Sequence, residues 1–420
     1  MPKTKFLNRQ VIAWALYDWG NSAFALSVLA VLFPLFLHSF WSAGDPGSAV
    51  TSRLSWATAL ASIVVSLLAP IIGAIADNGG YRKRFLFFLA IVGAVSTASL
   101  SLVEMGGWQA ALVLFVIASV GYYSANVFYD SLIVDVSPPR HYSLVSSLGL
   151  SLGYFGGASL LTVHVLMLNS PQAFGFASAN DVVRFAFISV GVWWLIFLLP
   201  LMFSVRENKT ATREGGHTIR AAYRALKDTF VKIQSYRKVF LFLVAYWFYV
   251  GGVFTVIFMA VNFGQRLGFA QVDLVRALLI TNFVGFPATL AYGFVGHHIG
   301  AKNAIYIGLA VYIGVACWAW FLKDVSQFYA MSITIGLVQG GVQAMSRSLF
   351  ASLIPSEQSG EFFGFYNMVT KFAHILGPVL VGTAAIFSDE PKFIIVAVLP
   401  MFVFGVLFLA RVRLDSPKTT

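Results

Sequence analysis

Long, uninterrupted runs of apolar residues constrain this chain more than any other feature of its sequence. A helix needs about 20 apolar residues to cross the hydrocarbon core of a bilayer. The runs do not alternate as the strands of a membrane barrel would, so we expect helices, which satisfy their own backbone polar groups in lipid. We count twelve such runs, at residues 11–38, 52–76, 84–104, 108–132, 143–168, 182–203, 239–263, 274–296, 303–322, 326–350, 362–387 and 392–411.

Composition supports the same interpretation. Hydrophobic residues make up 58% of the 420 residues and charged residues 11%, whereas soluble domains have roughly 25% charged residues. A multi-pass membrane protein is therefore expected. The single cysteine, Cys317, excludes an intramolecular disulfide. The first apolar run continues without a cleavage signature, so we expect it to remain as a span.

Lysine and arginine are distributed unevenly between the predicted loops. Twenty of the 28 lie on the side of the N-terminus, six lie on the opposite side, and Arg347 and Lys371 lie within spans. Because basic residues concentrate on the cytoplasmic side of a membrane, both termini are expected in the cytoplasm. This bias explains the net charge of +11 without a nucleic-acid partner. Short loops and the lack of a targeting peptide favour a bacterial cytoplasmic (inner) membrane.

The longest polar stretch divides the predicted spans six and six. We expect a first bundle at 1–204, a cytoplasmic linker at 205–238 and a second bundle at 239–420. Five apolar linker residues recur at helical spacing among Lys and Arg: Ile219, Tyr223, Leu226, Phe230 and Ile233. This spacing predicts an amphipathic helix on the inner membrane surface. A plain solvated linker is the alternative.

Polar residues form a stripe that occurs once in each half. Tyr122, Asn126 and Asp130 recur every fourth position, and the layout returns 217 residues later. The residues of the second copy are Gln339, Gln343 and Arg347. Each copy has one ionisable group eight residues before a proline, an acid in the first and a base in the second. Ionisable residues inside a span are functional candidates. We predict that Asp130 and Arg347 form a bridge that closes the cytoplasmic mouth; the alternative is that they bind substrate.

A second set of landmarks supports the duplication. Gly73, Asp77, Gly80 and Arg82 correspond at an offset of 220 to four later residues. The later residues are Gly293, His297, Gly300 and Lys302. Internal symmetry of this kind is typical of transporter folds, whose sites lie near the midplane between repeats.

The first of these segments, Gly73–Lys83 (GAIADNGGYRK), resembles the signature loop after the second span of the major facilitator superfamily. Its glycines, Gly73 and Gly80 among them, allow close helix approach and a tight turn. Asp77 can cap a neighbouring helix, and Arg82 can pair with Asp135. The resemblance implies a lock that holds the outward-facing state. The second copy has a histidine in place of the acid, so the lock is not expected there.

Three further segments are similar to the vacuole-effluxer-like branch of that superfamily. They are Ala13–Ser22 (AWALYDWGNS), Ser346–Phe350 (SRSLF) and Glu361–Tyr366 (EFFGFY). Fungal members of this branch are implicated in releasing amino acids from vacuoles during autophagy. The resemblance covers nearly the whole chain and implies an all-α fold of twelve transmembrane helices in two pseudo-symmetric bundles. It also implies that the first, fourth, seventh and tenth spans line a central cavity, flanked by the eleventh.

Polar residues on those five spans are candidates for a substrate and proton cavity. They are Asp18, Asn21, Tyr122, Asn126, Tyr246, Gln339, Gln343, Asn367, Lys371 and His374. The first half has acids and the second has bases, which suits a zwitterion such as an amino acid. We expect Lys371 to receive the substrate carboxylate and Asp18 to take a coupling proton, because a carboxyl group in an apolar wall responds to its surroundings. Alternatively, Asp18 is an acid at the membrane interface and His374 is a packing histidine.

The sequence has no Walker-type loop, nucleophile constellation or metal-ligand cluster, so we expect neither an enzyme nor a cofactor. The leading hypothesis is a secondary active transporter of a small-molecule substrate by alternating access. One alternative is an exporter of larger amphipathic compounds, and another is a non-transporting membrane receptor that kept the fold. No feature demands an oligomer, so a monomer is expected.

Overall fold

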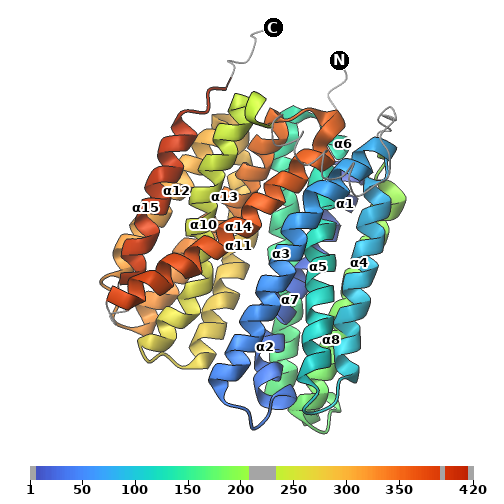
Figure 1. Cartoon of the computed structure of the whole chain (residues 1–420), viewed down its shortest axis with the longest axis vertical. Helices are drawn as coiled ribbons and strands as arrows, with labels where there is room; N and C mark the ends of the chain where they lie inside the picture. The colour runs from blue at the N-terminus through green and yellow to red at the C-terminus, as the bar shows by residue number, and fades with distance from the viewer. Residues whose placement is uncertain (1–5, 208–232, 388–392, 415–420) are drawn as a thin grey trace.

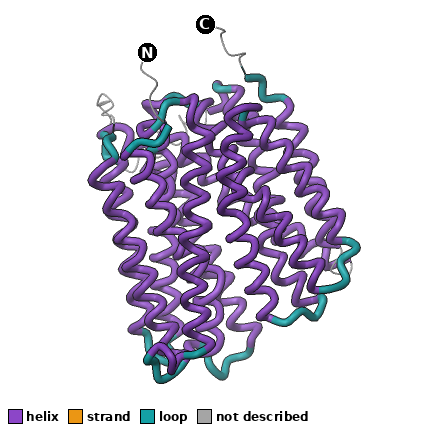
Figure 2. The backbone as a smooth tube through the Cα atoms, turned by 180° about the vertical axis from the view of Figure 1, so that it is seen from behind, coloured by secondary structure: helices purple, strands orange, loops and turns teal. Residues whose placement is uncertain are grey.

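The computed structural model describes residues 6–207, 233–387 and 393–414, and the regular elements in these ranges are all helical (Figures 1 and 2). The long helices of the first half are α1 (Arg9–Ala23), α3 (Gly47–Gly79), α4 (Arg82–Ser99), α5 (Trp108–Ser131), α7 (Tyr142–Asn169) and α8 (Ala179–Ser204). Those of the second half are α10 (Arg237–Arg266), α11 (Gln271–Ile299), α12 (Ala301–Ala319), α13 (Val325–Leu353), α14 (Ser359–Phe387) and α15 (Phe393–Ala410). Of the five residues of the predicted linker helix, four lie outside the described ranges.

The first membrane segment is not a uniform α-helix. After α1 the chain is π-helical over Phe24–Leu32 (η1), returns to an α-turn at α2 (Phe33–Phe36), and is π-helical again over Leu37–Trp41 (η2). Single π-helical turns often mark functional sites. Here η1 begins directly after the polar end of α1, which contains Asn21.

Nine helical segments in the described ranges are long and apolar enough to cross a membrane, the first running from Arg9 to Trp41. The helices α13, α14 and α15 are not among these nine, so the number of twelve spans stays a prediction. The short helix α6 (Ile133–Val136) and the 3-10 turn Pro139–His141 connect α5 to α7. Large apolar side chains such as Trp56 and Phe203 are exposed, as expected for a surface that faces lipid.

Helices of the two halves lie on opposite sides of the molecule, and α1 begins at the same end at which α15 finishes (Figure 1). The halves meet mainly where α3 packs on α14 and where α7 packs on α11 and α13. Glycines make both approaches possible. A Cβ atom on Gly364 of α14 would lie 2.6 Å from the carbonyl oxygen of Ala69 on α3, and one on Gly293 of α11 would lie 2.7 Å from Ser147 Cβ on α7.

Candidate functional site

An ion pair joins the two halves. Arg347 Nη1 on α13 donates to Asp130 Oδ1 on α5 at 2.9 Å, and only 6% and 14% of these side chains are exposed. Removing one partner of a buried ion pair costs about 3–5 kcal/mol, because the other charge is left uncompensated. The structure thus brings together the pair that the sequence repeat predicted, while its role as a gate stays a prediction.

The rest of the Arg347 guanidinium is held by α7 and by two aromatic rings. Its Nε donates to Ser146 Oγ and its Nη2 donates to the Ser146 carbonyl oxygen, both at 2.8 Å. The guanidinium carbon lies 4.9 Å from the ring centroid of Trp14 and 5.4 Å from that of Tyr129. These rings stack on each other at 4.4 Å, and Trp14 Nε1 donates to the Tyr129 carbonyl oxygen. Arg347 is therefore fixed in one position by hydrogen bonds and cation–π contacts.

Asp18 on α1 is the second acid beside Arg347. Its Oδ2 lies 4.0 Å from Arg347 Nη2 and accepts a hydrogen bond of 3.2 Å from the Tyr129 hydroxyl. The Asp18 side chain is 10% exposed. Sequence reasoning identified Asp18 and Asp130 separately, but it did not show that they converge on one arginine. Tyr129 and Ser146 were missed because neither residue type is unusual in an apolar helix.

Three amides extend this cluster. Asn21 Nδ2 donates to Asn126 Oδ1 at 2.7 Å, which links α1 to α5. Asn367 Nδ2 on α14 lies 3.4 Å from Asp130 Oδ2 and also donates to the Phe363 carbonyl oxygen at 3.0 Å. Asp130 consequently contacts both α13 and α14 of the second half.

Gln339 and Gln343 contact a residue that the sequence did not point to. Both donate to the Tyr154 hydroxyl on α7, at 3.1 and 3.4 Å. Tyr154 also packs against the backbone of Gly340. The two glutamines therefore join α13 to α7 across the halves. A single tyrosine in an apolar run gives no sequence signal for this role.

Tyr122 and Tyr246 are held mainly by aromatic neighbours within their own halves. The Tyr122 ring lies 5.1 Å from Phe24 and 5.8 Å from Trp194. Tyr246 stacks on Tyr366 at 4.3 Å. That Tyr122 lines the cavity together with Asp130 stays a prediction.

Lys371 is buried without a negative partner. Its side chain lies on α14 at 3% exposure, with Nζ 2.6 Å from the ring centroid of Tyr123 on α5. No carboxylate in the described ranges lies within ion-pair distance of it. His374, one turn further along α14, packs edge-on against Phe254 with the centroids 3.9 Å apart. A buried lysine whose amine meets a ring face, with no carboxylate near it in the described ranges, is an uncommon arrangement.

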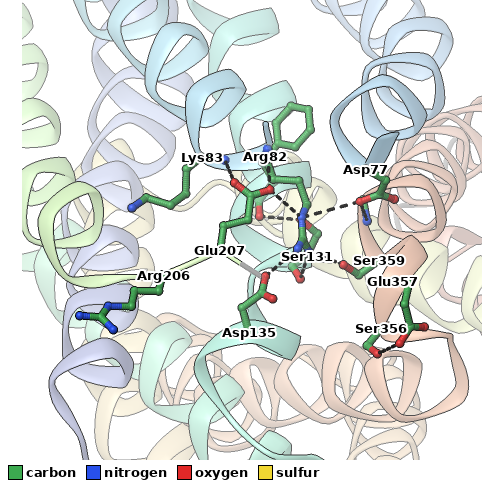
Figure 3. A network of polar contacts seen from close by, with 12 residues as sticks. Asp77, Arg82, Lys83, Ser131, Asp135, Arg206, Glu207, Ser356, Glu357 and Ser359 are labelled. Atoms are coloured by element: carbon green, nitrogen blue, oxygen red, sulfur yellow. Dashed lines mark hydrogen bonds and ion pairs between the residues drawn. The ribbon is translucent and has the colours of Figure 1, made fainter. Parts of the chain in front are cut away.

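The signature loop forms a second cluster, between α3, α4 and α14 (Figure 3). Asp77 accepts hydrogen bonds from the backbone N–H groups of Gly360 and Glu361 at 3.0 and 2.7 Å, which caps the start of α14 in the other half. Arg82 Nη2 lies 2.8 Å from Asp135 Oδ2, and Arg82 also donates to Ser359. Both expected contacts of the loop are therefore present. Gly80 ends α3 at φ 62°, a conformation that favours glycine.

Glu207, which follows α8 at the start of the predicted linker, was not a candidate from the sequence. Its carboxylate accepts the backbone N–H groups of Arg82 and Lys83 at 2.9 and 3.2 Å, so it caps the start of α4. It also lies 3.1 Å from Arg82 Nε (Figure 3). An acid at the start of a strongly basic linker gives no signal in the sequence alone that it caps a helix.

The second copy of the loop makes different contacts. His297, which corresponds to Asp77, lies at the end of α11 near His141, the residue before α7, with the ring centroids 6.2 Å apart. The side chain of His141, at the N-cap position of α7, makes no capping hydrogen bond. A histidine ring carries no negative charge to favour a helix N-terminus as the Asp77 carboxylate does, and the absence of a lock in this half stays a prediction.

One detail of the proposed repeat needs correction. Lys302 Nζ donates to the carbonyl oxygens of Ala410, the last residue of α15, and of Val412 beyond it. Lys83 Nζ makes the equivalent contacts with Met202, in the last turn of α8, and with Val205 beyond it. Lys302 therefore takes the place of Lys83, not of Arg82. The connection from α11 to α12 is one residue shorter than the connection from α3 to α4. The offset of 220 therefore does not extend to Lys302.

Comparison with known proteins gives consistent matches. The family described as "Vacuole effluxer Atg22 like" matches residues 46–136 and 135–420. The Bacillus subtilis protein named "Uncharacterized MFS-type transporter YxiO" is 33% identical over 411 residues, which cover 97% of this chain and 96% of that protein. Autophagy-related protein 22 of Eremothecium gossypii is 24% identical over 442 residues, covering 89% and 85% of the two chains.

Solved structures show the same fold at low sequence identity. The human organic anion transporter MFSD10 (TETRAN) superimposes with a TM-score of 0.77 at 15% identity, over 96% of this chain and 99% of that one. The major facilitator superfamily proton:xylose symporter XylE gives a TM-score of 0.67 at 16% identity, over 96% and 94%. At such identities the likeness concerns the arrangement of helices and not the substrate.

Proposed function

Because this chain belongs to the Atg22-like vacuole effluxer family of the major facilitator superfamily, we propose that it moves a small polar solute, an amino acid or similar zwitterion, by proton-coupled alternating access. Its relatives are transporters and not enzymes, and it is itself a multi-pass membrane protein of this transporter type. The solute, the proton and the direction of movement belong to the proposal.

The proposed arrangement in the membrane follows the distribution of basic residues. Twelve spans would form bundles at 1–204 and 239–420, joined by the linker 205–238, with both termini in the cytoplasm. The asymmetry of twenty basic residues against six supports this orientation. A monomer in a bacterial cytoplasmic membrane is the simplest form of the protein consistent with it.

The observation that most supports transport is that one arginine of the second half lies between two acids of the first. Arg347 contacts Asp130 at 2.9 Å and Asp18 at 4.0 Å. Charges buried between two bundles cost free energy unless they remain paired, so such pairs favour one arrangement of the halves. Separation of the halves would require these contacts, and those of Asp77 with α14, to break. We therefore propose that this is the state closed toward the cytoplasm.

The two acids suit different tasks. Asp130 accepts a short hydrogen bond from Arg347 and a longer one from Asn367. We therefore assign Asp130 to the gate, as the acid that holds the two halves together. Asp18 is further from Arg347, and the hydrogen bonds that it accepts from described residues come from the hydroxyl groups of Tyr129 and Ser22, at 3.2 and 3.5 Å. Protonation of Asp18 would leave the Asp130–Arg347 pair intact. Asp18 is therefore the proposed site of the coupling proton, and Lys371 the proposed site of the substrate carboxylate.

Transport by purified protein in proteoliposomes tests this proposal. Radiolabelled neutral amino acids would be supplied with an imposed pH gradient, and with the gradient collapsed by an ionophore. We expect accumulation that depends on the gradient and fails in Arg347→Gln. Transport of amphipathic dyes without any amino-acid transport would instead support an exporter of larger compounds. No movement of any solute class would contradict the transport proposal.

A further inference from the structure

The acids and the bases of the candidate cavity differ in whether an oppositely charged partner lies beside them. Asp18 and Asp130 both lie beside Arg347, at 4.0 and 2.9 Å. Asp130 Oδ2 is near the amide of Asn367, and Asp18 Oδ2 accepts from Tyr129. Both acids of the site therefore already have a cation and a further donor.

Little room remains around Asp18 for an additional group. A Cβ atom on Gly153 of α7 would lie 3.3 Å from Asp18 Cγ and 2.6 Å from Ser22 Oγ. The backbone of α7 thus packs directly against this carboxylate. An ammonium group of a substrate would have to displace the Tyr129 hydroxyl or compete with Arg347 to reach it, and displaced donors would lose their own hydrogen bonds.

Lys371 is in the opposite situation. It is 3% exposed, it lies over the ring of Tyr123, and no carboxylate in the described part of the chain pairs with it. A ring face stabilises a cation less than a paired carboxylate does, and a buried charge is costly when it is unpaired. An incoming anion would supply the missing counter-charge.

These observations indicate that the site contacts one end of its substrate and not the other. This deduction rests on the transport function proposed above. We infer that the protein recognises the carboxylate of its substrate through Lys371 and makes no specific contact with an amino group. The ligand class is then small organic monocarboxylates, in which 2-oxo acids are accepted as well as the corresponding amino acids. An amino-acid amide, which keeps the ammonium and loses the carboxylate, is rejected.

Matched ligands distinguish these possibilities. Thermal stability of the purified full-length protein would be measured against alanine, pyruvate and alaninamide, and against phenylalanine, phenylpyruvate and phenylalaninamide. We expect both carboxylates of at least one set to bind with affinities within roughly tenfold of each other, and the amide to bind at least about tenfold more weakly. Binding of the amino acid and its amide without the 2-oxo acid would overturn the inference, as would equal binding of all three.

Variants of Lys371 connect the result to this site. Lys371→Gln should weaken both carboxylates by roughly tenfold or more, while Lys371→Arg retains part of the affinity and Lys323→Gln, at an exposed position outside the helices, has no effect. Unchanged carboxylate affinity in folded Lys371→Gln would refute the assignment. If Lys371→Gln does not fold, Lys371→Arg and the wild-type ligand comparison still decide the question. Amino-acid binding without 2-oxo-acid binding would leave the proposed function standing, whereas no carboxylate binding in either set would count against both.

Discussion

Asp18 and Asp130 face the same guanidinium but hold it at different distances, 4.0 Å for Asp18 and 2.9 Å for Asp130. Asp130 makes the direct ion pair, and Asp18 lies in a second position with hydroxyl groups as its donors. Two acids around one arginine leave one negative charge in excess, and the longer contact identifies Asp18 as the group that gains a proton at lower cost. Substitutions of the two acids are therefore expected to have different effects on transport.

Neutralising either partner of the close pair should impair transport severely. Arg347→Gln leaves both buried acids without a cation, and Asp130→Asn leaves Arg347 with only its longer contact to Asp18. Breaking the close pair costs about 3–5 kcal/mol, which corresponds to roughly 100-fold or more in rate or population. The exchanged double variant Asp130→Arg/Arg347→Asp should recover part of the activity. Initial uptake rates, normalised to folded protein, measure this, with Glu104→Gln at an exposed site as the control. Failure of the exchanged pair to recover any activity would indicate that the charges act independently.

Replacing Asp18 should separate proton coupling from substrate movement. Asp18→Asn removes the acid but retains the Asp130–Arg347 pair, so exchange of labelled for unlabelled substrate should persist. Uptake driven by a pH gradient should be lost, and its dependence on pH should flatten. Both assays use the same proteoliposomes. Loss of exchange together with gradient-driven uptake would show that Asp18 is needed for the structure of the site and not for coupling alone.

The close approach of α3 and α14 should not tolerate a side chain. A Cβ atom on Gly364 would lie 2.6 Å from the Ala69 carbonyl oxygen and 2.7 Å from the Pro70 Cα, both backbone atoms that cannot move alone. Gly364→Ala is expected to lower the melting temperature and the transport rate, at a cost of about 1–3 kcal/mol. Gly314→Ala is the matched control, because nothing lies within 4 Å of its added atom. Equal melting temperatures for the two variants would contradict the packing argument.

Removing the Glu207 carboxylate should weaken the signature-loop cluster. Glu207→Ala leaves the backbone N–H groups of Arg82 and Lys83 without their acceptor and removes an ion pair, a loss of about 1–3 kcal/mol. Thermal unfolding of the purified protein should show the decrease. Glu357→Ala, at an exposed position whose carboxylate contacts only its neighbour Ser356 among the described residues, should be nearly neutral. Similar stability for both variants would remove Glu207 from the cluster.

An acid at residue 297 should favour the cytoplasm-closed state. The Asp77 carboxylate caps α14, whereas His297 lies near the start of α7, where the N-cap residue His141 makes no side-chain capping bond. His297→Asp would place a negative charge near the positive end of α7, for a gain of about 0.3–1 kcal/mol in the closed state only. Labelling of Ser348→Cys in a Cys317→Ser background should slow, because Ser348 contacts Ser143 of α7 across the halves. His298→Asp, at the neighbouring residue whose ring bonds to the Phe294 carbonyl oxygen of its own helix, is the control. Faster labelling in His297→Asp would contradict the prediction.

The sequence alone determined the class of the protein and the positions of its buried charges. Long apolar runs permit few structures in lipid, so the helical architecture followed from composition and spacing. The offset of 217 residues placed Asp130 and Arg347 at matching sites of opposite sign. Their contact is observed there because two duplicated bundles facing each other bring equivalent helices to the same depth.

Only the tertiary structure decided which partners each polar group meets. Spacing along one helix gives the direction of a side chain but not the helix opposite it, so Ser146, Tyr129, Tyr154 and Glu207 emerged only from the packed structure. The same limit applies to the charges. The sequence counted acids and bases, whereas the packing showed that both acids lie beside the one guanidinium of Arg347 and that Lys371 lies over a ring. Such pairing depends on distances between helices that are remote in sequence.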